Sequence, residues 1–206
     1  MTKVKICGIT NLDDALAAVH AGCDALGFIF YRKSPRYIAP LKAREIISHL
    51  PERVLTIGVF VNAREARIRK IVRLCGLDMI QLHGSESPAF CGRFKGYRVI
   101  KAFRVKNARG LERAKRYNTF AYLFDSFSPG TMGGTGKNFD WKLLACARGL
   151  GKNIFLSGGL NEGNVGRAVK LTAAPWVDVS SSVEERPGKK DSRKVIRFIK
   201  HAKEGR

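Results

Sequence analysis

Two side chains that can exchange protons stand at the ends of apolar runs in this sequence. Asp125 closes the run AYLFD, and a loop with glycines at 130, 133, 134 and 136 follows it. Cys7 closes the run KVKIC near the N-terminus. A carboxyl group can act as a general acid and a thiolate as a general base, so the pair suits a reaction that moves protons on one substrate, such as an isomerisation.

Two loops near the C-terminus predict a cradle for an anion. The segment SGGLNEGNV places Gly158 and Gly159 before a helical stretch, where backbone N–H groups and the helix dipole favour phosphate. The segment VSSSVEERPGKKD offers the hydroxyl and N–H groups of Ser180, Ser181 and Ser182. Each loop alone is a weak signal. Two such loops after neighbouring strands indicate a phosphate site.

The elements that must position these groups follow a regular alternation. Eight extended runs are each followed by a helical stretch or by a loop long enough to hold one. The expected strands are Lys3–Cys7, Ala25–Phe30, Val54–Val61, Met79–His83, Val99–Phe103, Ala121–Asp125, Ile154–Ser157 and Trp176–Ser180. The expected helices are Asp13–Ala21, Leu41–Leu50, Ala63–Leu74, Pro88–Phe94, Ala108–Arg116, Trp141–Arg148, Asn164–Leu171 and Ser192–Lys203, with Thr10 as the cap of the first.

Eight such units predict a single-domain α/β fold, a (β/α)8 TIM barrel over residues 1–206. An open doubly wound sheet is the alternative, but it usually has fewer strands and a glycine fingerprint after the first one. Here GIT follows the first strand. Barrel enzymes carry their chemistry at the carboxyl ends of the strands, where Cys7 and Asp125 stand.

The order of strands in a barrel then arranges the site. Strands seven and eight, with the phosphate loops, would lie between strand six with Asp125 and strand one with Cys7. Arg36, in the second loop, could hold a further anionic group of the ligand, and His83 ends the fourth strand. Taken singly, Cys7 is more often a buried thiol, Asp125 a helix cap, His83 a core histidine and Arg36 a surface cation. The shared barrel face of the first three favours a site.

Composition limits the other classes. The net charge of +21 raises the possibility of a nucleic-acid binder. However, most of the cations fall on helix faces opposite apolar residues: Ile68, Ile71, Val72 and Cys75 in one helix and Val195, Ile196 and Ile199 in another. No nucleic acid is therefore expected as a partner. No apolar run is long enough for a membrane span, and five scattered cysteines suit reduced thiols better than a zinc site. We expect a cytoplasmic protein, monomer or homodimer, without metal or cofactor.

Several strings resemble phosphoribosylanthranilate isomerase of tryptophan biosynthesis, and they run through the chain in order. They are KICGIT (5–10), GFIF with SPR (27–30, 34–36), QLHG (81–84), FDS with GGTG and FDW (124–126, 133–136, 139–141), LSGGL with NV (156–160, 164–165), and VDVSS with PGKKD (177–181, 187–191). The resemblance implies an Amadori rearrangement of the phosphosugar N-(5-phosphoribosyl)anthranilate. Cys7 would be the base, Asp125 the acid and Arg36 the holder of the anthranilate carboxylate. His83 and Gly134 would line the substrate, Gly134 in a mobile wall beside it.

The chemistry sets further expectations. Burial should favour the protonated form of Asp125, and nearby positive charge should favour the thiolate of Cys7. Strand alternation points Lys5 and Asp178 into the barrel, which predicts an ion pair between them below the site. Where the family pattern has VDVSSG, this chain has Ser182, which would strain the loop if the position needs a positive φ.

Three alternatives stay open at this point. A related barrel acting on another phosphosugar would share the phosphate loops but should lack KICGIT and SPR. A bifunctional isomerase is harder to separate by sequence. A basic nucleic-acid binder would bind DNA or RNA in a salt-sensitive way and ignore phosphosugars.

Overall fold

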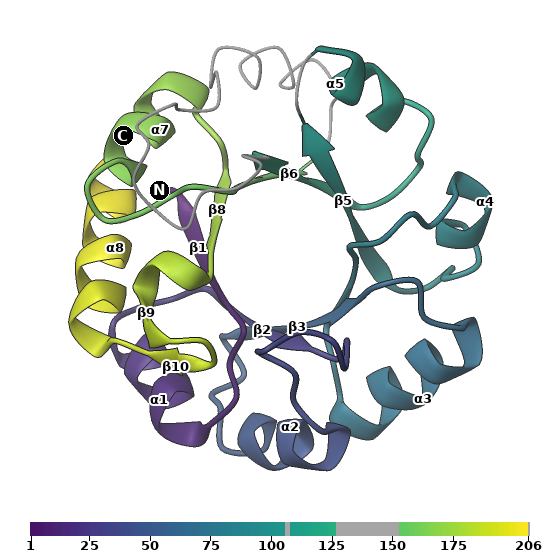
Figure 1. Cartoon of the computed structure of the whole chain (residues 1–206), viewed down its shortest axis with the longest axis horizontal. Helices are drawn as coiled ribbons and strands as arrows, with labels where there is room; N and C mark the ends of the chain where they lie inside the picture. Colours follow the sequence, from purple (N-terminus) through teal and green to yellow (C-terminus); the bar gives the residue numbers. More distant parts are fainter. Residues whose placement is uncertain (106–107, 127–152, 206) are drawn as a thin grey trace.

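Eight parallel strands close into a barrel, seen down its axis in Figure 1. The computed structural model describes residues 1–105, 108–126 and 153–205. The strands are β1 (Lys3–Cys7), β2 (Ala25–Ile29), β3 (Leu55–Phe60), β4 (Met79–Leu82), β5 (Arg98–Val105), β6 (Ala121–Ser126), β7 (Asn153–Ser157) and β8 (Trp176–Val179). Each pairs with the next, and β8 pairs with β1, so the barrel is confirmed and the open sheet is wrong.

Helices form the outer ring of the barrel (Figure 1). They are α1 (Leu12–His20), α2 (Pro40–Ile47), α3 (Glu65–Cys75), α4 (Pro88–Cys91), α5 (Ala108–Ala114), α7 (Val165–Thr172) and α8 (Ser192–Glu204). The expected helix Trp141–Arg148 lies outside the described residues. The other predicted helices and all eight strands are confirmed, with ends that differ by a few residues.

Strand alternation divides the core into two parts. One face of each strand packs outward against the helices, with residues such as Ile6, Phe28 and Ile80. The other face fills the barrel with a separate cluster: Ala25, Ile57, Met79, Ile100, Ala102, Ala121, Leu123, Phe155 and Trp176. Going along β4 to β8, the inward positions change from apolar in the barrel centre to polar toward the carboxyl end. Polar side chains therefore line the carboxyl end of the barrel, where barrel enzymes carry their sites.

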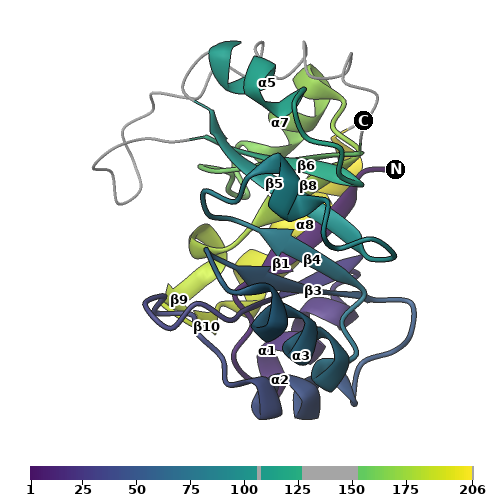
Figure 2. The same ribbon diagram turned by 90° about the vertical axis from the view of Figure 1, so that its right-hand side faces the viewer.

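A small hairpin was not predicted from the sequence. After β8 the chain forms a short 3-10 helix, η2 (Ser181–Val183), and then pairs β9 (Glu184–Arg186) with β10 (Lys189–Lys190). Figure 2 shows this hairpin at the end of the barrel away from the N-terminus, where the strands finish. The hairpin therefore stands at the same end as the candidate site.

Two local predictions are wrong. Asn11, not Thr10, caps α1, because its side chain accepts the Asp14 N–H at 2.9 Å. Ile196 is 53% exposed, since the buried stripe of α8 runs through Val195, Phe198, Ile199 and Ala202 and leaves position 196 to one side. The predicted stripe of α3 is confirmed in full, and its cations Arg67, Lys70 and Arg73 lie on the opposite, more accessible face.

Candidate active site

Cys7 and Asp125 both lie at the carboxyl end of the barrel, on strands separated by β7 and β8. Asp125 pairs in register with Ser157 on one side and Arg104 on the other. Its side chain is 28% exposed, so burial is only partial. Cys7 is 6% exposed and next to Gly27 of β2. The predicted order around the barrel is confirmed.

The predicted ion pair below Cys7 is present. Nζ of Lys5 lies 2.7 Å from Oδ1 of Asp178, and both side chains are buried. Ser157 Oγ donates to the second oxygen of Asp178 at 2.9 Å. Gly27 makes this packing possible, because a Cβ there would stand 2.7 Å from Cys7 Sγ and 3.1 Å from Lys5 Cε. The floor of the site is therefore polar but internally paired.

The net shift in the pKa of Cys7 differs from the expectation. Burial raises the pKa of the Cys7 thiol, and the charge of Lys5 opposes this but does not overcome it. Lys5 acts in the predicted direction, but Asp178 beside it pushes the pKa of Cys7 up again. Burial alone would lower the pKa of Lys5; its two neighbours outweigh burial and raise it. At neutral pH the site thus holds a thiol beside a charged lysine.

His83 stands next to Asp125 at the barrel mouth. Its Nε2 lies 3.6 Å from Oδ2 of Asp125, and its Nδ1 lies 2.9 Å from Nε2 of Gln81. With the amide assigned so that Gln81 donates, Nδ1 accepts and the proton is on Nε2, directed at the carboxylate. The side chain of His83 contacts the candidate acid, which is compatible with its expected place beside the substrate.

Glu86 and Lys101 hold the loop that follows His83. The carboxylate of Glu86 accepts from the backbone N–H groups of Asn62 and Gly84, at 2.8 and 2.9 Å. Lys101 Nζ donates to the same carboxylate at 2.9 Å and to Gly84 O at 2.8 Å. Because Glu86 and Lys101 are both buried, this network fixes the start of the loop and with it the position of His83.

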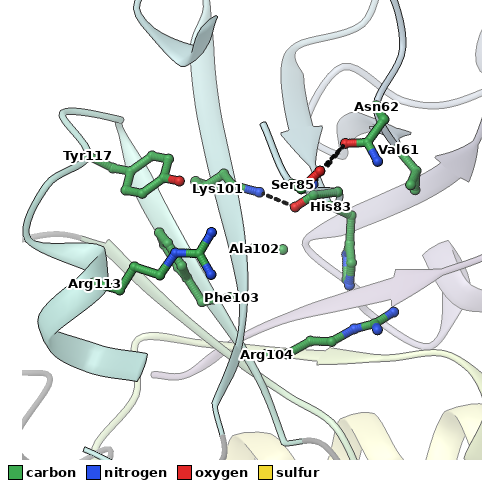
Figure 3. A pocket seen from close by; sticks show the side chains of 11 residues that line it. Val61, Asn62, His83, Ser85, Lys101, Ala102, Phe103, Arg104, Arg113 and Tyr117 are labelled. Carbon is green, nitrogen blue, oxygen red and sulfur yellow. Dashed lines mark hydrogen bonds between the residues drawn. The ribbon is translucent and has the colours of Figure 1, made fainter. Parts of the chain in front are cut away.

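A pocket of about 400 Å³ opens beside this network (Figure 3). In the figure, Arg104 and Arg113 approach it from β5 and α5, and Asn62 and His83 stand on the opposite wall. The complete lining is Val61, Asn62, His83, Gly84, Ser85, Lys101, Ala102, Phe103, Arg104, Arg113 and Tyr117. Through His83 the pocket adjoins the mouth of the barrel.

Arg36 is bound to a residue that no sequence motif indicates. Its Nε lies 2.8 Å from Oε1 of Glu184, and its Nη2 lies 2.7 Å from Oε2. Lys190 Nζ lies 2.9 Å from the same Oε1. Glu184 and Lys190 both lie in the segment VEERPGKKD. The sequence of that segment does not indicate that Glu184 rather than Glu185 is the buried acid. The pairing joins positions 148 residues apart.

The two predicted phosphate loops lie side by side and are tied together. Gly158 and Gly159 have φ angles of 82° and 66°, which glycine adopts without strain. They stand before α7, which begins at Val165, one residue after the expected start of that helix at Asn164. Ser182 Oγ donates to Leu160 O across the two loops. Ser182 is absent from the described residues with positive φ, so the strain considered for this position does not arise.

The serine hydroxyls are used within the protein. Ser180 Oγ donates to Cys7 O at 3.0 Å, which joins the end of β8 to the end of β1. The hydroxyl groups of Ser180 and Ser182 therefore donate to protein carbonyls rather than pointing free into the site. Ser181, at the start of η2, is exposed. Gly134 lies outside the described residues.

Other site classes find no support within the described part of the chain. No group of three or more His, Cys, Asp or Glu side chains there could hold a metal ion. The four cysteines described, Cys7, Cys23, Cys75 and Cys91, are free thiols. None of the described helices is long and apolar enough to cross a membrane.

Comparisons with protein families, with known sequences and with solved structures agree with one another. The family model described as N-(5'phosphoribosyl)anthranilate (PRA) isomerase matches residues 4–201. The N-(5'-phosphoribosyl)anthranilate isomerase of Citrifermentans bemidjiense is 54% identical over 203 residues, 98% of each chain. The crystal structure of the Thermotoga maritima enzyme superposes with a TM-score of 0.94, at 47% identity over 99% of this chain and 100% of that one.

One further solved relative contains a bound ligand. A phosphoribosyl anthranilate isomerase in complex with reduced 1-(o-carboxyphenylamino)-1-deoxyribulose 5-phosphate has a TM-score of 0.91 and 44% identity, covering 99% of this chain and 100% of that one. Because the family model and relatives at this identity span almost the whole chain, the protein belongs to the phosphoribosylanthranilate isomerase family.

Proposed function

We propose that this protein converts N-(5'-phosphoribosyl)anthranilate to 1-(2-carboxyphenylamino)-1-deoxyribulose 5-phosphate, with Asp125 as general acid and Cys7 as general base. Family membership along the chain gives the reaction. One observation carries the residue assignment: Asp125 and Cys7 flank the two strands whose loops form the proposed phosphate site. A phosphosugar anchored there has one proton-exchanging group on each side.

The first step opens the sugar ring. Asp125 transfers its proton to the ring oxygen as the bond between C1 and that oxygen breaks, and the anilino nitrogen lone pair forms a C1=N iminium. Asp125 becomes a carboxylate, and His83 Nε2 lies near enough to stabilise that charge. The partial exposure of Asp125 supports this role, because its carboxyl group is accessible to a ring oxygen at the mouth of the barrel.

The second step moves the proton at C2. The thiolate of Cys7 takes it, the C2–H electrons form a C1=C2 bond, and the iminium electrons return to nitrogen. The resulting enolamine becomes the ketone when its C2 hydroxyl loses a proton and C1 gains one. Lys5 supports the base through its charge, and its pairing with Asp178 keeps that lysine in place beneath Cys7.

Anchors at both ends of the substrate favour this geometry. The phosphate would bind the N–H groups of the loops after β7 and β8, and the anthranilate carboxylate would bind Arg36. Arg36 stands against the residue that follows β1, since a Cβ on Gly8 would lie 2.8 Å from its Cδ. Holding both ends aligns C1, C2 and the ring oxygen between the acid and the base.

A fluorescence assay tests the proposal directly. Freshly prepared phosphoribosylanthranilate is mixed with the protein, and its loss is followed alongside chromatographic identification of the product. The wild-type protein should consume it and Cys7→Ser should not, although both bind inorganic phosphate. No consumption by the folded wild-type protein would refute the function. The cytoplasmic location, the absence of a cofactor and a monomeric or homodimeric state stay predictions.

A further inference from the structure

Glu184 is a buried carboxylate that holds two cations beside the candidate site. It is 7% exposed and contacts Arg36 from the loop after β2 and Lys190 from its own hairpin. Glu184 and Lys190 are directly opposite each other in the pairing of β9 with β10. The hairpin therefore fixes the position of the carboxylate, and the carboxylate in turn fixes Arg36.

The contact uses one particular edge of the guanidinium. Glu184 accepts from Nε at 2.8 and 3.1 Å and from Nη2 at 2.7 Å, which is a fork along the side of the group. A guanidinium has five N–H donors. The two on Nη1 and the second on Nη2 are not used by this fork, and together they form the end of the group, which suits a second carboxylate.

The surroundings restrict the other rotations of Arg36. Its Cβ and Cδ pack over Gly8, where an added Cβ would lie 2.8 Å from Cδ. The Cβ added at Gly8 would also be 3.1 Å from Ser180 Oγ, the hydroxyl that donates to Cys7 O. The side chain of Arg36 is only 20% exposed. The side chain of Arg36 thus packs against Gly8, the residue after β1, while the side edge of its guanidinium is occupied by Glu184.

Glu184 stays ionised over a wide pH range. Burial alone would raise its pKa, but the hydrogen bonds from Arg36 and Lys190 outweigh burial and hold the pKa of Glu184 below its usual value. Lys190 is itself almost fully buried and donates also to Ser180 O at 3.1 Å. The charge that orients Arg36 is therefore present at every pH at which the enzyme would work.

We propose that Glu184 is a positioning residue: by occupying the side edge of Arg36 it turns the end of the guanidinium toward the substrate's aryl carboxylate. This inference rests on the proposed function, because it takes that carboxylate as the ligand of Arg36. A free arginine would sample several rotamers and lose that entropy on binding, whereas the fixed one has already lost it on folding. Glu184 thereby favours a substrate with a carboxylate over one without it.

A pair of inhibitors separates this role from simple support of the hairpin. The first is reduced 1-(o-carboxyphenylamino)-1-deoxyribulose 5-phosphate, and the second is the same compound without the carboxylate. Affinities are measured by calorimetry for wild type, Glu184→Gln, Arg36→Met and the double variant. Glu185→Gln, at the exposed neighbouring position, is the control that should match wild type.

Glu184→Gln should weaken the carboxylate-bearing inhibitor about tenfold, comparable to the loss of one charge-assisted hydrogen bond. Its affinity for the second inhibitor and for inorganic phosphate should change less than about twofold. In the Arg36→Met background the Glu184 substitution should add nothing, because the group it positions is gone. In turnover, KM for phosphoribosylanthranilate should rise while kcat changes little.

Equal weakening of both inhibitors, or full additivity with Arg36→Met, would show that Glu184 only supports the loop and would overturn the proposal. If Glu184→Gln does not fold, Glu184→Asp keeps the charge but shortens its reach, and the same selective loss is expected. Wild-type protein that discriminates the inhibitors but does not turn over phosphoribosylanthranilate would instead refute the proposed function.

Discussion

Lys5 and Asp178 form a buried ion pair directly beneath Cys7, with Nζ and Oδ1 2.7 Å apart. Ser157 Oγ donates to the other oxygen of Asp178 at 2.9 Å. The pair makes a lysine possible inside the barrel, because a charged group there needs a partner. Burial raises the pKa of the Cys7 thiol above this pair, and the charge of Lys5, opposed in part by Asp178, does not reverse that shift.

Removing Asp178 should destabilise the fold strongly. Asp178→Asn leaves Lys5 buried without its partner, and breaking a buried pair in this way costs about 3–5 kcal/mol. The free energy of unfolding in urea measures the loss. Glu112→Gln, which breaks the exposed pair with Lys115, should change it by less than about 1 kcal/mol. A similar small change in Asp178→Asn would mean that the interior pair is not needed for the fold.

The thiol of Cys7 should titrate above the usual range. Burial raises its pKa and Lys5 only partly reverses this, so the thiolate fraction and kcat/KM should both increase as pH rises above neutral. The difference in thiolate absorbance near 240 nm between wild type and Cys7→Ser reports the titration. A thiolate already formed at pH 7 in the wild-type protein would show that Lys5 outweighs burial and would contradict this prediction.

Alkaline pH should weaken the fold through Cys23. Burial, with Asp24 adding to it, raises the pKa of Cys23 to about 12. The folded protein keeps this proton where the unfolded chain loses it. The resulting stability is therefore complete below about pH 9 and is lost as pH rises toward 12. Urea unfolding at several alkaline pH values should show a smaller decline in Cys23→Ala than in wild type.

Val19→Ala is the matched control for Cys23. Val19 is a buried residue of α1 that does not titrate, so its truncation should lower stability without changing the dependence on pH. An identical alkaline decline in wild type, Val19→Ala and Cys23→Ala would exclude Cys23 as the source.

Ser182 should strengthen the proposed phosphate site by joining its two halves. Its hydroxyl donates to Leu160 O, which links the loop after β8 to the loop after β7. Ser182→Ala keeps the backbone N–H and needs no positive φ, so only the link is lost. Phosphate affinity should fall about two- to tenfold, the range of one ordinary hydrogen bond. Calorimetry with inorganic phosphate measures this affinity, and Ser48→Ala, at a distant exposed position, is the control. Unchanged affinity in Ser182→Ala would show that the hydroxyl has no part in phosphate binding.

Much of this arrangement could be predicted from the sequence because it follows from local patterns. The alternation of β1 and β8 is enough to point Lys5 and Asp178 into the barrel, and the parallel register brings them opposite each other. The same reasoning places Cys7 and Asp125 at one end. Closed βα topology leaves few other arrangements, so element order alone determines which strands are neighbours.

The remaining features depend on contacts between distant segments. The strands of the hairpin, EER and KK, are too short and too polar to show any alternation. The bond between Arg36 and Glu184 spans 148 residues, and no local pattern indicates it. The protonation of Cys7 depends on how far burial outweighs Lys5, which is a balance of two opposing effects that residue types cannot supply.

The most direct test of the acid and base assignment is single-turnover consumption of phosphoribosylanthranilate by wild type, Cys7→Ser and Asp125→Asn, with phosphate affinity measured on the same samples. Loss of a general acid or base typically costs about 10²- to 10⁴-fold in rate. We expect a decrease of that size in each variant, with phosphate affinity and unfolding free energy close to wild type. A near-normal rate in either folded variant would contradict the role assigned to that residue.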